Sequence, residues 1–180
     1  MRISKSHTAG VIIDVQEKLF PHMNDRDSLE KSTNILIQGM KILEIPFLVT
    51  EQYTKGLGFT ISSVQDNIED HSKIEKVAFS CCDSPDFMTH LQSMGKTHVV
   101  VAGIEAHVCV LQTVVDLLEN GFKVMVVTDC VSSRKPRDKE IALGRMEQEG
   151  AMLATYESVL FELCRYSGTD QFKMISKLVK

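Results

Sequence analysis

Short runs of β-branched and other apolar residues alternate along this chain with segments of helical periodicity. The apolar runs cover residues 10–15, 46–50, 98–102 and 123–128, with shorter candidates at 74–79 and 151–155. Apolar side chains recur at helical spacing over 29–43, 84–94, 109–118, 137–149 and 169–178. Strands that are apolar on both faces and alternate with helices form right-handed βαβ units. The pattern therefore predicts an α/β fold, a three-layer α/β/α sandwich around a mostly parallel sheet with Rossmann-like topology.

Length and composition narrow the class of protein. With 180 residues the chain can bury a core without disulfides and is too short for two full domains, so we expect a single domain over residues 1–180. Its apolar stretches are much shorter than the ~20 residues of a membrane span. Because no apolar run of the secretory type precedes the first strand, we expect a cytoplasmic location and leave mitochondrial association open.

Charge and cysteine usage bear on possible partners. A net charge of -4 disfavours sequence-independent nucleic-acid binding, and the basic cluster at 134–137 is interpreted as a solvated loop, with anion binding as the alternative. Five cysteines without a Cys-x-x-Cys pair indicate reduced thiols, and the six histidines, His71 among them, are scattered. We expect no nucleic-acid or membrane partner, no metal and no cofactor.

Polar residues at strand ends are the candidates for chemistry, because ligands of such sheets bind beyond the carboxyl ends of the strands. Asp14 ends the first apolar run and could act as a base, although capping a turn is an equal alternative. Cys109 follows a buried strand and opens a helix, whose free N–H groups would lower the pKa of its thiol; the alternative is a small buried hydrophobe. Lys76 could pair with Asp14 if both face one cleft. Together the three would supply a nucleophile, a base and a cation.

These residues carry a resemblance to a known family. Asp14 in IIDVQEKL, Lys76 in KxxFS and Cys109 in GIEAHVCV resemble the isochorismatase-like cysteine hydrolases. The blocks at 49–58 and 129–134 are similar to those of the eukaryotic isochorismatase-domain-containing proteins and their bacterial relatives, and the similarity extends from about residue 8 to residue 180. The resemblance implies an isochorismatase-like α/β fold and a homo-oligomer, either a dimer or a tetramer.

The resemblance also implies a mechanism. Cys109 would attack a C–N bond of a small amide-like substrate to form a thioester-type intermediate, Asp14 would carry the thiol proton to the leaving amine, and Lys76 would balance the charge. A cis peptide bond between Ile104 and Glu105 would aim the N–H groups of Glu105 and Cys109 at the oxyanion. The residues expected to shape the substrate pocket are Gln16, Phe20, Leu57 and His107.

A metal motif that this chain lacks and two alternative functions bear on the predicted mechanism. The nicotinamidase branch of the family carries an Asp-x-His metal motif where this chain has TEQYT at 50–54, so a metal-independent reaction is expected. A non-catalytic or redox-sensitive binding or scaffold protein with a reactive thiol is the alternative, because a low-pKa thiol also predicts sensitivity to oxidants. A ribonuclease role is a third option that the acidic charge balance does not favour.

Overall fold

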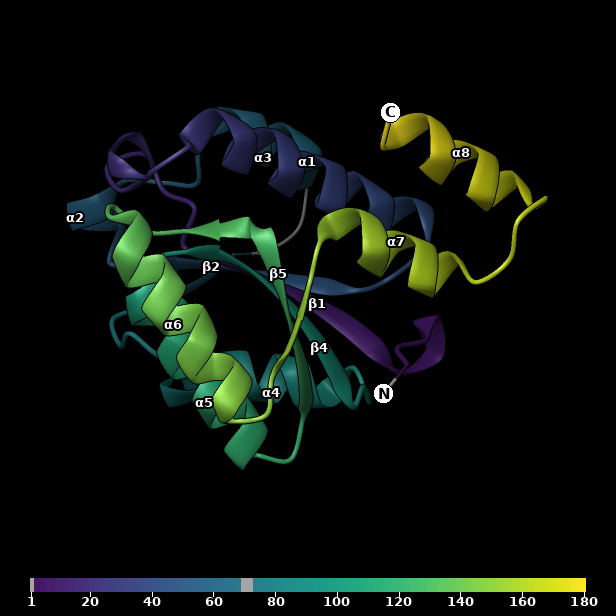
Figure 1. The fold of residues 1–180 in the computed structure, drawn as a ribbon. Coiled ribbons are helices and arrows are strands. Elements are labelled where there is room, and N and C mark those ends of the chain that lie inside the picture. Colours follow the sequence, from purple (N-terminus) through teal and green to yellow (C-terminus); the bar gives the residue numbers. More distant parts are fainter. Residues whose placement is uncertain (1, 69–72) are drawn as a thin grey trace.

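The computed structural model describes residues 2–68 and 73–180, and at its centre lies a six-stranded parallel sheet (Figure 1). The order of the strands is β3-β2-β1-β4-β5-β6. Every apolar run that was predicted to be a strand is one. Their bounds are β1 (Thr8–Ile13), β2 (Phe47–Gln52), β3 (Lys73–Lys76), β4 (His98–Ile104), β5 (Lys123–Ser132) and β6 (Met152–Ala154).

Helices follow or separate the strands. The α-helices are α1 (Arg26–Ile42), α2 (Thr54–Leu57), α3 (Ser62–Ile68), α4 (Pro85–Ser93), α5 (Leu111–Glu119), α6 (Pro136–Gln148), α7 (Tyr156–Cys164) and α8 (Asp170–Leu178). Short 3-10 turns are η1 (Lys5–His7), η2 (Phe20–His22) and η3 (Cys81–Asp83), and a π-helical turn, η4 (Ala106–Val110), leads directly into α5. The sequence analysis predicted α1, α4, α5, α6 and α8, but it missed the short α2 and α3 and also α7. A start signal for α7 is present in the sequence, since Thr155 and Ser158 form a capping box.

The helices cover both faces of the sheet, which confirms the three-layer prediction. Helices α1, α3, α7 and α8 lie on one face, and α4, α5 and α6 lie on the other (Figure 1). Strand β1 is buried on both sides: Ile12 packs in the core beneath α1, whereas Val11 and Ile13 pack in the core beneath α5. The order 3-2-1-4-5-6 is that of the dinucleotide-binding doubly wound fold, which opens a crevice where the strand order reverses, between β1 and β4.

A glycine permits the close approach of β1 and β4 beside this crevice. Gly103 pairs with Ile13 and has a φ of 129°, a backbone conformation that side chains rarely allow. A Cβ atom at this position would collide with the Ile13 carbonyl oxygen. The segments that follow the two strands, with Asp14 on one and Cys109 on the other, therefore leave the sheet side by side.

Within residues 2–68 and 73–180, none of the helices combines the length and the apolar character that crossing a membrane would require.

Candidate active site

Three neighbouring strands and one helical turn bring the predicted catalytic residues together at the carboxyl edge of the sheet. Asp14 directly follows β1, Lys76 is the last residue of β3, and Cys109 lies in η4, just after β4. Strand β2 lies between β1 and β3 and adds Thr50 and Gln52 from its own end. Residues far apart in the sequence thus meet because the carboxyl ends of parallel strands share one edge.

Asp14 and Lys76 form a buried ion pair. Lys76 Nζ lies 2.6 Å from Asp14 Oδ2, and the two side chains are 1% and 0% exposed. The lysine also donates to the carbonyl oxygens of Ala78 and Phe79, each at 3.1 Å, and Thr50 Oγ1 donates to Asp14 Oδ1 at 2.7 Å. Burial is the largest single effect and acts to lower the pKa of Lys76. The negative charge of Asp14, the smaller effects of Cys81 and Cys109 and the hydrogen bond to Asp14 together outweigh it, so the pKa is raised and the lysine stays charged. The pair is held in place because the three hydrogens of the ammonium and both oxygens of the carboxylate have hydrogen-bond partners.

The Cys109 thiol lies beside this pair, and its environment favours the protonated form. The residue is 3% exposed. Burial, followed by the negative charge of Asp14 and a hydrogen bond with that carboxylate, raises the pKa of the thiol, while Lys76 acts in the opposite direction. The expected lowering of this pKa by a helix N-terminus is therefore wrong. Desolvation and the neighbouring carboxylate keep the thiol protonated, so it needs a base when it reacts.

Gln52 completes the surroundings of the sulfur, and the sequence analysis did not single it out. The Cys109 thiol donates to Gln52 Oε1 at 3.2 Å, and Gln52 Nε2 donates to the carbonyl oxygen of Val77 at 3.2 Å. The signal was available, because Gln52 is a polar residue at the end of a buried strand. The predicted strand stopped at residue 50, and the last residue of β2 was therefore overlooked.

Gln16 holds the backbone of Gln52. Its side chain is completely buried, with Oε1 accepting from the Gln52 N–H at 2.7 Å and Nε2 donating to the carbonyl oxygens of Gln52 at 2.9 Å and Gly58 at 2.7 Å. All of these partners are backbone atoms. The predicted influence of Gln16 on the substrate pocket would therefore act through the position of Gln52.

The other predicted pocket residues lie on three separate elements. Phe20 is in η2 and packs into the core beneath α1, and Leu57 is half-buried in α2. His107 is in η4, where its Nδ1 lies 2.9 Å from Ser133 Oγ and its Nε2 lies 3.9 Å from Asp138 Oδ2. Contact of these three side chains with a substrate stays a prediction.

The turn that carries Cys109 starts with a cis peptide bond between Ile104 and Glu105. The carbonyl oxygen of Glu105 accepts from the N–H groups of Val108 and Val110 at 3.0 and 3.2 Å. Its carboxylate accepts from Arg134 Nε at 2.9 Å, so this arginine of the basic cluster is paired even though its side chain is 61% exposed. The use of the Glu105 and Cys109 N–H groups as oxyanion donors stays a prediction.

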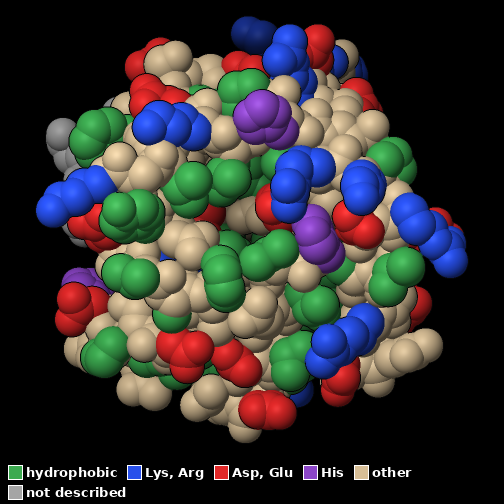
Figure 2. Space-filling model, turned by 90° about the vertical axis from the view of Figure 1, so that its left-hand side faces the viewer, with side chains coloured by type: hydrophobic (Ala, Val, Ile, Leu, Met, Phe, Trp, Pro, Cys, Tyr) green, Lys and Arg blue, Asp and Glu red, His purple; other side chains and the backbone are tan. Residues whose placement is uncertain are grey.

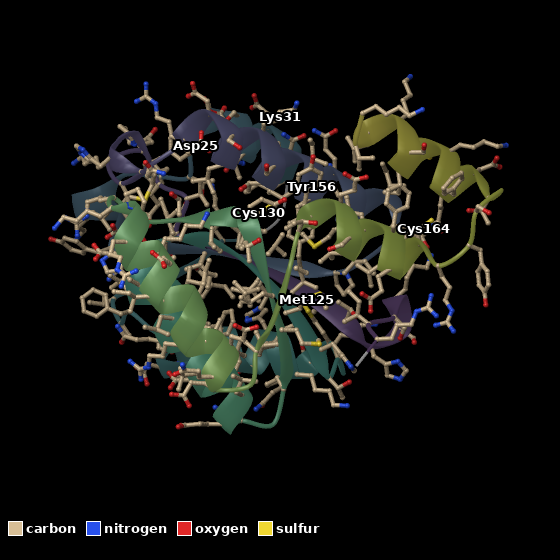
Figure 3. The ribbon with its side chains drawn as sticks, viewed as in Figure 1. Asp25, Lys31, Met125, Cys130, Tyr156 and Cys164 are labelled. Carbon is tan, nitrogen blue, oxygen red and sulfur yellow. The ribbon has the colours of Figure 1, made fainter. Side chains whose placement is uncertain are left out.

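The remaining cysteines differ from Cys109 in position or in environment. Cys81 is close to the ion pair, with its Sγ 3.8 Å from Thr50 Oγ1, but it is fully buried, and burial raises its pKa to about 11. Burial likewise raises the pKa of Cys82 to about 12. Cys130 lies on β5, facing the core beneath α1, and Cys164 lies at the end of α7 (Figure 3). These last two thiols are on the side of the sheet opposite the core that contains Cys109.

Apolar side chains are exposed near the carboxyl edge of the sheet. Figure 2 looks onto this edge and shows hydrophobic side chains across the middle of the face, with charged side chains around them. Segments that directly follow β2, α2 and β3 contribute Tyr53, Phe59, Val77 and Phe79, which are 53%, 61%, 78% and 52% exposed. The surface next to the predicted site therefore suits a neutral or apolar ligand better than a highly charged one.

The described part of the chain contains no group of three or more His, Cys, Asp or Glu side chains arranged to hold a metal ion. His71 lies outside the described residues.

Sequence comparison places the chain among known proteins. Residues 8–158 match the profile of the isochorismatase domain. The secreted isochorismatase effector Isc1 of Phytophthora sojae is 38% identical over 174 residues, which cover 94% of this chain and 82% of the effector. Isochorismatase domain-containing protein 2 of Danio rerio is 37% identical over 180 residues, which cover 99% of this chain and 89% of that protein.

Solved structures agree with the sequence comparison. The MAR1 ribonuclease of Caenorhabditis elegans superposes with a TM-score of 0.94 at 39% identity, over 99% of this chain and 92% of that one. The YcaC protein of Escherichia coli, described as an octameric hydrolase of unknown specificity, has a TM-score of 0.93 at 26% identity, over 99% and 90% of the two chains. YcaC of Pseudomonas aeruginosa, solved with hexane-2,5-diol and covalent acrylamide, has a TM-score of 0.92 at 26% identity, over 98% and 91%.

Proposed function

Because this chain belongs to the isochorismatase family, we propose that it is a metal-independent cysteine hydrolase that cleaves the C–N bond of a small amide-like substrate. The observation that carries the proposal is the buried cluster of Asp14, Lys76 and Cys109. It places a thiol next to a carboxylate that can accept its proton and a lysine that keeps the carboxylate in position.

The reaction proceeds in two steps. In the first, Asp14 accepts the Cys109 proton as the sulfur attacks the amide carbon; the S–C bond forms, the C–N bond breaks, and Asp14 returns the proton to the leaving amine. In the second, water attacks the thioester and Asp14 accepts a proton from it. The S–C bond then breaks, and the proton returns to the sulfur as the acid product leaves.

The raised pKa of the Cys109 thiol fits this sequence of steps. A thiol that is neutral at rest becomes nucleophilic only when its proton can move to Asp14 during the attack. The covalent acrylamide in the Pseudomonas aeruginosa YcaC structure supports a small amide as the kind of molecule that a protein of this fold admits.

A substrate screen tests the proposal. Purified protein is incubated with amides, carbamates and hydroxamates, and the released amine and acid are both quantified. The Cys109→Ala variant should lose turnover, whereas Cys164→Ala, at the far end of α7, should keep it. Equal turnover by the Cys109→Ala variant and the unaltered protein would rule out Cys109 as the nucleophile.

A redox-sensitive binding or scaffold role is less consistent with the thiol. Oxidation by peroxides requires thiolate character, and burial together with Asp14 raises the pKa of Cys109. We therefore expect slow sulfenic acid formation at neutral pH. Rapid oxidation of Cys109 combined with an absence of turnover would favour this alternative.

The ribonuclease option rests on the name of the Caenorhabditis elegans protein. A chain with a net charge of -4 has a poor charge balance for holding a phosphate backbone. RNA should therefore remain intact in the same screen. Cleavage of RNA by the unaltered protein but not by the Cys109→Ala variant would support the ribonuclease option instead.

We further propose that the chain acts as one domain in a homo-oligomer in the cytoplasm. Assembly is supported by the octameric Escherichia coli YcaC and by the exposed apolar side chains beside the site.

A further inference from the structure

The side chain that faces the Cys109 thiol is itself a primary carboxamide. Gln52 Oε1 accepts from the thiol at 3.2 Å, and Gln52 Nε2 donates to the Val77 carbonyl oxygen at 3.2 Å. Both halves of the amide group are therefore used, with its oxygen toward the sulfur and its nitrogen toward a fixed acceptor. A primary carboxamide substrate would bring the same kind of N–H donor to that acceptor.

The carbonyl oxygen of Val77 is one of three consecutive carbonyl acceptors at the site. Three consecutive residues after β3 direct their carbonyl oxygens at polar side chains of the site: those of Ala78 and Phe79 accept from Lys76, and that of Val77 accepts from Gln52. A carbonyl in such a place selects for an N–H donor, because a ligand that lacks one leaves the acceptor without a partner.

Gln52 is fixed at its backbone and held by hydrogen bonds at its tip. The main chain is tied to Gln16 through the N–H and the carbonyl oxygen of Gln52. Among the described residues the side-chain amide has one hydrogen-bond partner at each end, so rotation about the side-chain bonds would release both the thiol and Val77 without moving β2. The residue is 9% exposed, so it is largely buried at rest.

The charges around the thiol favour a neutral ligand. Asp14 is paired with Lys76, and Glu105 is paired with Arg134. The Lys76 ammonium already donates to Asp14, Ala78 and Phe79, so a carboxylate substrate would have to displace one of these partners to reach it.

We propose that the Gln52 NH2 group occupies the place of the substrate's NH2 group, and that the substrate is a neutral primary carboxamide whose NH2 group donates to the Val77 carbonyl after Gln52 has rotated away. This inference rests on the proposed function, since Cys109 must be the nucleophile. The thiol has one proton and two acceptors within reach, Gln52 Oε1 and Asp14. Displacement of Gln52 removes the first acceptor and leaves the proton to Asp14, so substrate binding itself prepares the thiol for attack.

A matched pair of thiol reagents tests the substrate class. Acrylamide and methyl acrylate are similar in size and alkylate sulfur in the same way, but only acrylamide carries an amide N–H. Alkylation of Cys109 is followed by peptide mass spectrometry, and each rate is divided by the rate of the same reagent with glutathione. We expect the normalised preference for acrylamide to be about tenfold, the cost of one unpaired buried acceptor. A ratio near one would overturn the assignment of a primary carboxamide.

Variants of Gln52 test the rotation. In Gln52→Ala the normalised rates of both reagents should rise about tenfold, because the group that covers the thiol is gone, while the preference for acrylamide remains. Gln52→Asn, which keeps an amide on a shorter stem, should show an intermediate increase. Gln92→Ala, the same change at an exposed position of α4, should leave both rates unaltered. Equal rates in Gln52→Ala and the unaltered protein would overturn the role of Gln52.

A separate variant distinguishes this inference from the proposed function. Asp14→Asn should shift the pH profile of Cys109 alkylation, because it removes the charge that raises the thiol pKa. An unchanged profile in Asp14→Asn would contradict the proposed function. A shifted profile together with an unresponsive Gln52→Ala would keep the proposed function and reject only the role of Gln52.

Discussion

At the scale of single residues, the site depends on how two charges act on one sulfur. Burial raises the pKa of the Cys109 thiol most, the Asp14 carboxylate raises it further, and the Lys76 ammonium lowers it. Burial strengthens both effects because little water screens them. The carboxylate thus favours the protonated thiol at rest, and it lies within hydrogen-bond reach of the thiol proton.

Asp14→Asn should therefore separate thiol reactivity from catalysis. The variant keeps Lys76 and loses the negative charge of Asp14, so the pKa of the Cys109 thiol should fall. Each unit by which this pKa falls raises the thiolate fraction at neutral pH about tenfold. Hydrolysis should decrease about 100- to 10,000-fold because the proton carrier is missing. Iodoacetamide alkylation as a function of pH, measured beside turnover, checks both. Slower alkylation at neutral pH would contradict the assigned charges.

The Asp14–Lys76 pair should also matter for stability. Lys76→Met leaves a buried carboxylate without its cation, which costs about 3–5 kcal/mol of unfolding free energy. The matched control is Lys173→Met: Lys173 Nζ lies 2.9 Å from Asp170 Oδ1, with side chains 69% and 94% exposed. Removing that exposed pair should hardly change the stability. Urea denaturation of both variants measures the difference, and similar effects of the two would argue against a buried pair.

At the scale of elements, the main steric constraint lies where the backbones of β1 and β4 approach each other. Gly103 faces the Ile13 backbone, and the neighbouring segments carry Asp14 and Cys109. A side chain at this position would push apart the two strands whose ends form the site. The requirement for glycine is therefore structural and functional at once.

Gly103→Ala should destabilise the fold, and Gly144→Ala should not. At Gly103 the new Cβ would collide with the Ile13 carbonyl oxygen, and the φ of 129° is unfavourable for alanine. Gly144 is within α6, where a Cβ meets nothing within 4 Å, so alanine should stabilise by about 0.5–1 kcal/mol through helix propensity. Thermal and urea unfolding of the two variants should shift in opposite directions. Shifts in the same direction would contradict the close approach of β1 and β4.

At the scale of the whole molecule, the carboxyl edge of the sheet combines the buried charge pair with an exposed apolar surface. The four exposed residues that follow β2, α2 and β3 are Tyr53, Phe59, Val77 and Phe79. Apolar side chains gathered around a site serve either a ligand or a neighbouring subunit.

Light scattering after size-exclusion chromatography should show an assembly larger than the 20.2 kDa chain. The expectation follows from this apolar surface and from the octameric hydrolase that shares the fold. A mass of one chain across the micromolar range would contradict the proposed homo-oligomer.

The strands and most of the helices could be predicted because their signal is local. A continuous β-branched run or a helical period is visible within a dozen or so neighbouring residues. Element bounds and short helices were harder to predict, as the early end assigned to β2 illustrates. That small error hid Gln52, which is the last residue of the strand.

By itself, the sequence determined the alternation of strands and helices, the parallel sheet that follows from it, and the likeness of Asp14, Lys76 and Cys109 to a family of hydrolases. Tertiary structure decided the direction of the Cys109 pKa, the contact of its thiol with Gln52, and the burial of Gln16 against the backbone. The physical reason is separation along the chain. Cys109 and Gln52 are 57 positions apart and Lys76 and Asp14 are 62 apart, so their distances and mutual desolvation exist only after the strand ends have met.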